Sequence, residues 1–210
     1  MVQHYAARCR DRRRCRVDVI DWRLPEPVTN NIWYNGQSLA IQDCLYRQMV
    51  SSRYVLFSDL DEFLVPHGRQ LTNWTDLVRT LERPRSCGFQ FHSAFFDPGA
   101  QPPAGLGRPD LLTMRATQRS RHYSTVRTKC MVRTYEIFEA GIHHVSKPIW
   151  AHLTVDRVST DVALLHHYRK CHSMYGMNCE GVVEDDTARR YWDELTRAVS
   201  NVSKELDNIL

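Results

Sequence analysis

The sequence predicts an α/β fold, because helix-like and strand-like patterns follow one another along the chain. Over residues 35–50 the apolar side chains recur at the spacing of an α-helix. These positions are Leu39, Ile41, Leu45, Tyr46 and Met49. The run 53–58 is short and rich in β-branched and aromatic residues, which is typical of a buried strand. A strand that directly follows a helix is typical of a β-α-β unit.

The first strand of that unit is expected over residues 17–22, where apolar and polar side chains alternate. Pro25 and Pro27 follow, so we expect this strand to end in a proline-containing loop. The helix after it is expected to be capped by Asn35 or Ser38.

The pattern of mixed elements continues after residue 66. A second helix is expected over 72–82, with Thr72 as its N-cap. The segment 97–110 is rich in glycine and proline and is long enough to be a functional loop. The other expected elements are strands over 89–92, 129–133, 141–145 and 162–168, and a partly amphipathic helix over 187–206.

Composition is that of a soluble globular protein with a mild net charge of +4 over 210 residues. The excess of positive charge is concentrated in an arginine cluster near the N-terminus. Its members are Arg8, Arg10, Arg12, Arg13, Arg14 and Arg16. Such a cluster is either a nucleic-acid or nuclear-localisation patch or a solvated surface. We expect no nucleic-acid partner, because no aromatic residue alternates with these arginines.

The cysteines leave the compartment of the protein open. There are seven, and none forms the C-x-x-C pairs of structural zinc sites. An odd number fits either a secretory domain with some disulfides or a cytosolic protein with buried thiols. Asn73 and Asn201 begin N-glycosylation sequons, which require a secretory route. No apolar run reaches transmembrane length and no signal-peptide core follows Met1, so a targeting segment would lie outside this sequence.

The acidic motif Asp59-Leu60-Asp61-Glu62 is the strongest functional signal. Carboxylates at the end of a buried strand are costly unless their charge is compensated. In an extended backbone Asp59 and Asp61 would point to the same face, so we expect them to converge. Converging carboxylates are typical ligands of hard divalent cations. In open α/β sheets, ligands bind at the carboxyl ends of strands, where this motif falls.

An ordered set of sequence blocks resembles glycosyltransferase family 92. The blocks are residues 34–47, residues 53–66 with the acidic motif, Lys129 with Val132-Arg133, the segment 141–144, and His167-Tyr168-Arg169. The resemblance covers residues 17–170.

The resemblance implies a GT-A-like nucleotide-diphospho-sugar transferase sandwich. It implies transfer of galactose from UDP-galactose to a glycan acceptor with inversion, in the Golgi lumen, by a protein held in the membrane through an anchor that this chain lacks. We accordingly expect a basic segment over 1–16, a family 92-like domain over 17–185 and a C-terminal helix over 186–210. Domains of this type open with a strand and helix that hold the nucleotide base, and we expect that first β-α unit to be absent here.

The resemblance also implies roles for particular residues around a divalent cation, Mn²⁺, bound to the UDP-sugar. Asp61 is expected to bind the metal directly, Asp59 through water or the ribose, and Glu62 to orient either group. A third metal ligand is expected to be His143 or His167.

Phosphate charge is expected to be held by Lys129 and Arg169. An inverting transfer also needs a general base. Spacing does not decide among its candidates, which are Asp97, Glu136, Glu139 and Asp156.

Two other functions remain open at this point. A phosphatase of the haloacid dehalogenase type also carries D-x-D after an apolar strand, with Asp59 as nucleophile, Asp61 as acid/base and 182–186 as the later acidic motif. That family, however, prefers Thr or Val at the position of Phe63. The other alternative is a catalytically inactive fragment that binds ligands without turning them over, which the expected absence of the nucleotide-binding start favours.

Overall fold

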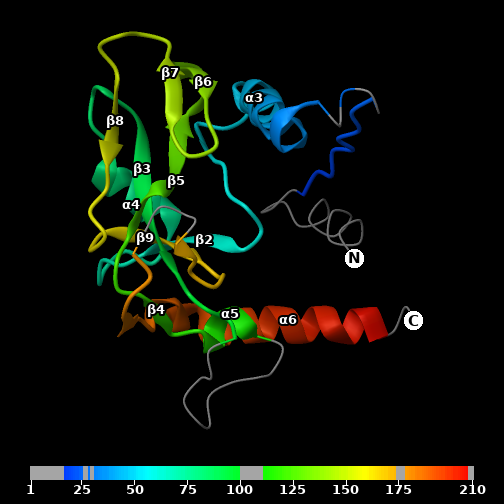
Figure 1. Cartoon of the computed structure of the whole chain (residues 1–210), viewed down its shortest axis with the longest axis vertical. Coiled ribbons are helices and arrows are strands. Elements are labelled where there is room, and N and C mark those ends of the chain that lie inside the picture. The colour runs from blue at the N-terminus through cyan, green and yellow to red at the C-terminus, as the bar shows by residue number, and fades with distance from the viewer. Residues whose placement is uncertain (1–16, 26–27, 29–30, 100–110, 174–177, 208–210) are drawn as a thin grey trace.

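Figure 1 shows the computed structural model, which describes residues 17–25, 28, 31–99, 111–173 and 178–207. Its centre is a six-stranded mixed sheet in the order β1-β5-β3-β9-β2, with β8 also paired to β3. The strands are β1 (Tyr54–Leu56), β2 (Glu62–Pro66), β3 (Ser86–Phe95), β5 (Ser124–Arg133), β8 (Thr154–Arg157) and β9 (Ala163–His167). The α/β class predicted from the sequence is therefore confirmed.

β3 organises the sheet because it has partners along both edges. It pairs antiparallel with β5 on one edge. On the other edge it pairs in parallel with β8 through Ser86–Gln90 and with β9 through Ser93–Phe95. β9 then pairs antiparallel with β2, which places Glu62 opposite His167. Sheet pairing thus brings the acidic motif next to a histidine that lies about a hundred residues later in the chain.

Two helices cover opposite faces of this sheet. Residues Met131 and Val132 of β5 point to opposite faces, because side chains alternate along a strand. Met131 belongs to a cluster with Phe89, Phe91 and Leu77, the last from α4 (Trp74–Leu81). Val132 belongs to a second cluster, which includes Ile41 and Leu45 of α3 (Gln37–Gln48) and Ile137.

The remaining elements lie around the rim of the sheet. Figure 1 shows α3 beside β6 and β7, and α6 at the opposite end of the molecule. β6 pairs with β7, and β4 pairs with β10, both antiparallel. The elements not yet given are η1 (Trp33–Gly36), α5 (Leu112–Arg115), β4 (Gln118–Ser120), η2 (Thr134–Glu136), β6 (Ile137–Ala140), β7 (Val145–Pro148), β10 (Val182–Glu184), η4 (Thr187–Tyr191) and α6 (Trp192–Asp207).

The strand predicted over residues 17–22 is wrong. These residues have no regular structure, and none of the described strands pairs with them. Val19 and Ile20 remain more than half exposed, at 58% and 51%. An alternating pattern becomes a strand only when it finds a hydrogen-bonding partner, and none of the described segments supplies one. The β-α-β unit is therefore not formed, and β1 is instead an edge strand paired antiparallel with β5.

Local predictions differ in their outcome. The helix over 35–50 is confirmed as α3, but its N-cap is Gly36 in the left-handed region rather than Asn35 or Ser38. The helix over 72–82 is confirmed as α4, but Asn73 is its N-cap, not Thr72. The predicted strand over 141–145 is wrong, because residues 141–144 form the turn between β6 and β7, closed by a hydrogen bond from Gly141 N to His144 O. The segment 141–144 connects the paired strands β6 and β7 and is not itself part of a strand.

The strands over 53–58, 89–92, 129–133 and 162–168 are confirmed as β1, β3, β5 and β9, and the helix over 187–206 as η4 and α6. The basic segment over 1–16 and most of the loop over 97–110 lie outside the described residues.

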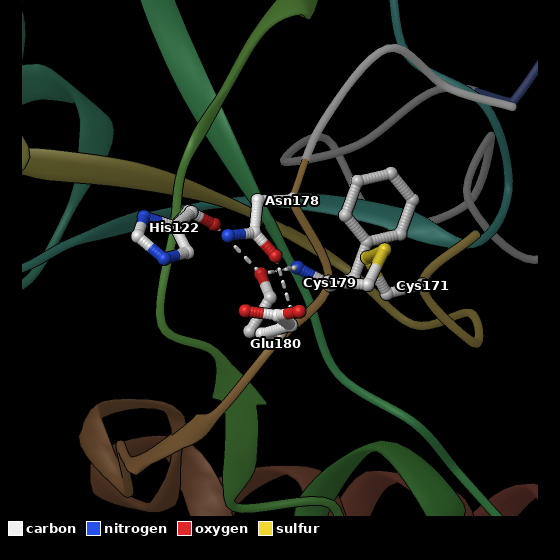
Figure 2. Close-up of a disulfide and its surroundings, with 7 residues drawn as sticks. His122, Cys171, Asn178, Cys179 and Glu180 are labelled. Carbon is white, nitrogen blue, oxygen red and sulfur yellow. Dashed lines mark hydrogen bonds between the residues drawn. A yellow bond between two sulfur atoms is a disulfide. The ribbon is translucent and has the colours of Figure 1, made fainter. Parts of the chain in front are cut away.

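A disulfide joins Cys171 and Cys179 in the segment between β9 and β10 (Figure 2). Next to it, the Asn178 side-chain oxygen accepts a hydrogen bond of 2.7 Å from the backbone of Glu180. Cys44, Cys87 and Cys130 are free thiols.

The N-cap of α4 gives a direct test of this helix boundary. The Asn73 side-chain oxygen accepts a hydrogen bond of 3.0 Å from the backbone N–H of Asp76. We expect Asn73→Ala to lower the free energy of unfolding by about 1 kcal/mol, because a backbone donor loses its partner. Thr72→Ala, at the neighbouring position, should change it by less than about 0.5 kcal/mol. Urea denaturation of the unglycosylated protein measures both, and equal effects would contradict this cap.

Candidate functional site

A cleft of about 1110 Å³ lies next to the acidic motif. One wall is made by the turn that carries Asp59 and Asp61, and a second by η1 and the start of α3. The third is made by β6, β7 and the turn between them. Five of the predicted site residues line it: Asp59, Asp61, His143, His167 and Arg169. These five residues come from three separate parts of the sequence and meet around one cavity.

The acidic motif is a tight turn and not an extended strand end. The backbone N–H of Glu62 donates to the carbonyl of Asp59, at 3.1 Å. The Glu62 carboxylate in turn accepts a hydrogen bond of 3.0 Å from the backbone N–H of Asp59. The prediction that an extended backbone makes Asp59 and Asp61 converge was therefore wrong about the backbone. Both aspartates still line the cleft, because the turn places them there.

Lys129 is the buried cation that compensates the motif. It lies in β5, and its side chain is only 2% exposed. Its ammonium nitrogen lies 3.0 Å from a carboxylate oxygen of Asp59 and 3.1 Å from one of Glu62. Lys129 is not among the residues that line the cleft. Its ammonium is enclosed between these carboxylates, so it contacts the acidic motif directly and can hold the motif in position.

Asp61 faces a histidine across the β2–β9 pair. The Asp61 carboxylate oxygen lies 3.4 Å from His167 Nε2, and the backbone carbonyl of Asp61 accepts a hydrogen bond from Tyr168 N. The His167 ring stacks on Phe95, with 4.7 Å between the ring centroids, and its other nitrogen lies 3.6 Å from Glu62. The ring is therefore held in one orientation, with Nε2 directed toward the half-exposed carboxylate of Asp61.

His143 lies in the turn between β6 and β7, and its ring nitrogens already have partners. Nδ1 lies 3.0 Å from the Thr128 carbonyl, so Nδ1 carries the proton and donates it. Nε2 lies 3.2 Å from the Arg127 guanidinium, whose N–H it accepts. Burial lowers the pKa of His143 below its ordinary value and keeps the ring neutral. To bind a metal through Nε2, His143 would have to release Arg127.

The structure separates the four candidates for the general base. Glu139, in β6, lines the cleft. Asp97, Glu136 and Asp156 are not among its lining residues. Glu136 instead pairs with Arg133, at 3.2 Å. Sequence spacing left the choice of general base open, and position at the cleft leaves Glu139 as the remaining candidate.

An aromatic rim at the cleft was missed by the sequence reasoning. Trp33 and Tyr34 line the cavity and are 72% and 56% exposed. Tyr34, Asn35 and Gly36 all have positive φ, which is rare for non-glycine residues and marks a backbone conformation held by its surroundings. The Trp22 indole donates to the Asn35 carbonyl, at 3.3 Å. The Asn35-Gly36 pair is a recognisable turn signal in the sequence, although it does not reveal the neighbouring cleft.

The donor set of the cleft fits a divalent cation of the manganese type. Asp61 is 45% exposed on its side chain and so remains accessible from the cavity, and His167 offers an imidazole nitrogen beside it. Carboxylate, imidazole and water are suitable ligands for such a cation. Asp59 is partly neutralised by Lys129 and accepts a long hydrogen bond of 3.4 Å from Gln37, which suits a supporting position better than a primary one.

The later acidic motif required by the phosphatase alternative lies elsewhere. Asp185 pairs with Arg119, at 2.9 Å, and is not among the residues that line the cleft. β1, which precedes Asp59, is an edge strand in antiparallel pairing. The two acidic motifs therefore do not share a site, and the geometry does not support a phosphatase.

Comparison with known proteins agrees with the sequence blocks. The model of the family described as Glycosyltransferase family 92 matches residues 4–203. A curated relative, "Beta-1,4-galactosyltransferase galt-1" of Caenorhabditis elegans, is 30% identical over 203 residues. The matched region is 91% of this chain and 42% of that relative. The chain thus spans less than half the length of the curated protein that it matches.

Replacing Lys129 tests whether it compensates the acidic motif. We expect Lys129→Met to lower the free energy of unfolding by about 3 kcal/mol, because the buried Glu62 carboxylate loses its cation. Lys170→Met removes an exposed lysine and should cost less than about 0.5 kcal/mol. Denaturant titration of both variants measures the difference. A Lys129→Met protein as stable as the wild type would contradict the assignment.

Proposed function

The chain belongs to glycosyltransferase family 92, and we propose that its cleft binds a UDP-sugar through Mn²⁺ and transfers the sugar to a glycan acceptor with inversion. Galactose is the proposed sugar, because the curated relative is named as a galactosyltransferase. The observation that carries the proposal is the meeting of Asp59, Asp61 and His167 in one cleft beside the buried Lys129.

The residues of the cleft divide into binding and supporting groups. Asp61 and His167 would hold the metal, whose positive charge would neutralise the diphosphate leaving group. Asp59 would contact bound water or the ribose, kept in place by Lys129. Arg169 lines the same cavity and would contact a phosphate oxygen. Lys129 was predicted to hold phosphate charge directly, and its enclosed position favours an indirect role through the two carboxylates that it contacts.

Glu139 is the proposed general base. It lines the cleft from β6, in a different wall from the one that carries the acidic motif. A base on that side would take the proton of the acceptor hydroxyl as it attacks the anomeric carbon. Trp33 and Tyr34 at the rim would offer apolar faces to a sugar ring or to the nucleotide base.

The proposed location is the Golgi lumen. The Cys171–Cys179 disulfide fits an oxidising compartment of that kind. Among the residues that the structure describes, no helix is long and apolar enough to cross a membrane.

The metal site is tested by Asp61→Ala. Calorimetric titration of the wild-type protein with UDP in the presence of Mn²⁺ should give a binding signal that depends on the metal. In Asp61→Ala we expect that signal to disappear, whereas Asp161→Ala, which removes an exposed aspartate outside the cleft, should retain it. Metal-dependent binding that survives in Asp61→Ala would refute the site. A folded wild-type protein that binds no UDP would favour the inactive-fragment alternative.

The base is tested by Glu139→Gln, which keeps the size of the side chain and removes its ability to accept a proton. We expect kcat to fall by about 10²- to 10⁴-fold, with UDP binding unchanged. Glu194→Gln, in the exposed part of α6, is the matched control and should leave kcat unchanged. An unaltered kcat in Glu139→Gln would exclude Glu139 as the base.

A further inference from the structure

A second group of metal-ligating side chains lies outside the cleft. His67 follows β2, His166 lies in β9, and Asp185 follows β10. One ligand atom from each lies within 4.8 Å of the others. None of the three lines the cleft. His166 and His167 are neighbours in β9, so their side chains leave opposite faces of the strand and serve different sites.

The cluster is enclosed by the protein. His166 is fully buried, and the side chains of His67 and Asp185 are only 14% and 6% exposed. The His166 ring stacks on Phe96, with 4.2 Å between the ring centroids, and its Nδ1 lies 3.4 Å from the Tyr168 hydroxyl. This fixes the ring so that Nε2 is directed at His67, with 2.9 Å between the two Nε2 atoms.

We propose that His67, His166 and Asp185 form a zinc site that is separate from the cleft. Zinc prefers imidazole and carboxylate ligands, at bonds of about 2.0–2.2 Å in tetrahedral geometry, so ligand atoms lie about 3.3 Å apart. The His67–His166 and His67–Asp185 separations of 2.9 and 3.9 Å lie on either side of that value. Three protein ligands leave the fourth position to a water molecule.

Hydrogen bonds around the cluster orient the proposed ligand side chains. Arg119 lies 2.9 Å from Asp185 Oδ2, the same oxygen that faces His67, and the Thr187 backbone N–H donates to Oδ1, at 3.2 Å. A zinc ion would therefore share Oδ2 with the Arg119 guanidinium. The Tyr168 hydroxyl lies at the second ring nitrogen of His166, the position at which metal-bound histidines usually have an outer partner.

The three ligands come from different parts of the fold. His67 follows the edge strand β2, His166 lies in its neighbour β9, and Asp185 follows the small β4–β10 sheet, which an isolated bridge between Phe96 and Arg119 connects to the end of β3. A metal at this point would hold the small sheet, and the η4–α6 segment that directly follows it, against the central sheet. The proposed zinc would link these elements, its three protein ligands and one water match the ligand count of zinc sites with an exchangeable position, and it does not depend on the proposed transferase function.

The alternative is a direct hydrogen bond between the two imidazoles, which the 2.9 Å separation also allows. The two readings differ in what they predict for metal content. A hydrogen-bonded pair needs no metal, and one of its nitrogens must carry the proton that zinc would displace.

The experiment measures zinc in the Asp61→Ala protein, in which the cleft has lost its principal acidic ligand. After incubation with zinc and exhaustive dialysis, elemental analysis should find a single zinc ion per chain. Replacement of zinc by cobalt(II) should give the visible absorption of a tetrahedral site. His67→Gln in the same background should bind zinc at least about tenfold more weakly, since loss of an outer partner alone typically costs about 10- to 100-fold.

His152→Gln removes an exposed histidine outside the cluster and should leave zinc content unchanged. The partly exposed His67 is the chosen position because replacing the fully buried His166 could prevent folding. Circular dichroism checks that each variant is folded. Absence of zinc from the Asp61→Ala protein, or equal zinc content in His67→Gln, would overturn the proposal and leave the hydrogen-bonded pair.

Discussion

The ion pairs of Lys129 with Asp59 and Glu62 are the constraint on which the site depends. Glu62 is buried at the start of β2, and a carboxylate there is tolerated only when a cation or hydrogen-bond donors compensate it. Lys129 supplies the cation from β5, which β3 and β9 separate from β2 in the sheet order. The Asp59 backbone supplies a donor, which closes the turn. The contacts that compensate the buried charge of Glu62 therefore also fix the turn of the acidic motif.

The pairing of β2 with β9 then determines which side chain faces the acidic motif. Because β2 and β9 are antiparallel, with Glu62 opposite His167, the histidine ring lies beside Asp61 at the cleft. The same pairing leaves His166 on the other face, next to His67 and Asp185. The two adjacent histidines of β9 thus have different surroundings. His167 lines the cavity, whereas His166 is enclosed by Phe96 and Tyr168.

The sequence predicted the elements whose signal is local. The helical spacing around Ile41 and Leu45 and the apolar run before Asp59 were each sufficient to identify α3 and β1. The alternating pattern over 17–22 was equally regular, but the strand predicted from it was wrong. A strand requires a pairing partner, which the pattern does not specify. The N-cap predicted for α4 was wrong for a related reason. Asn73 and Thr72 are both good capping residues, and only the backbone geometry selects Asn73.

For the site, the sequence by itself determined the family and indicated several residues that line the cleft, because ordered blocks such as Asp59-Leu60-Asp61 and His167-Tyr168-Arg169 are linear features. Tertiary structure alone decided how they interact. It enclosed Lys129 between carboxylates, engaged both nitrogens of His143, and placed Glu139, but not Asp97, Glu136 or Asp156, at the cleft. Each of these depends on distances between segments far apart in the chain, which are set by sheet pairing and burial.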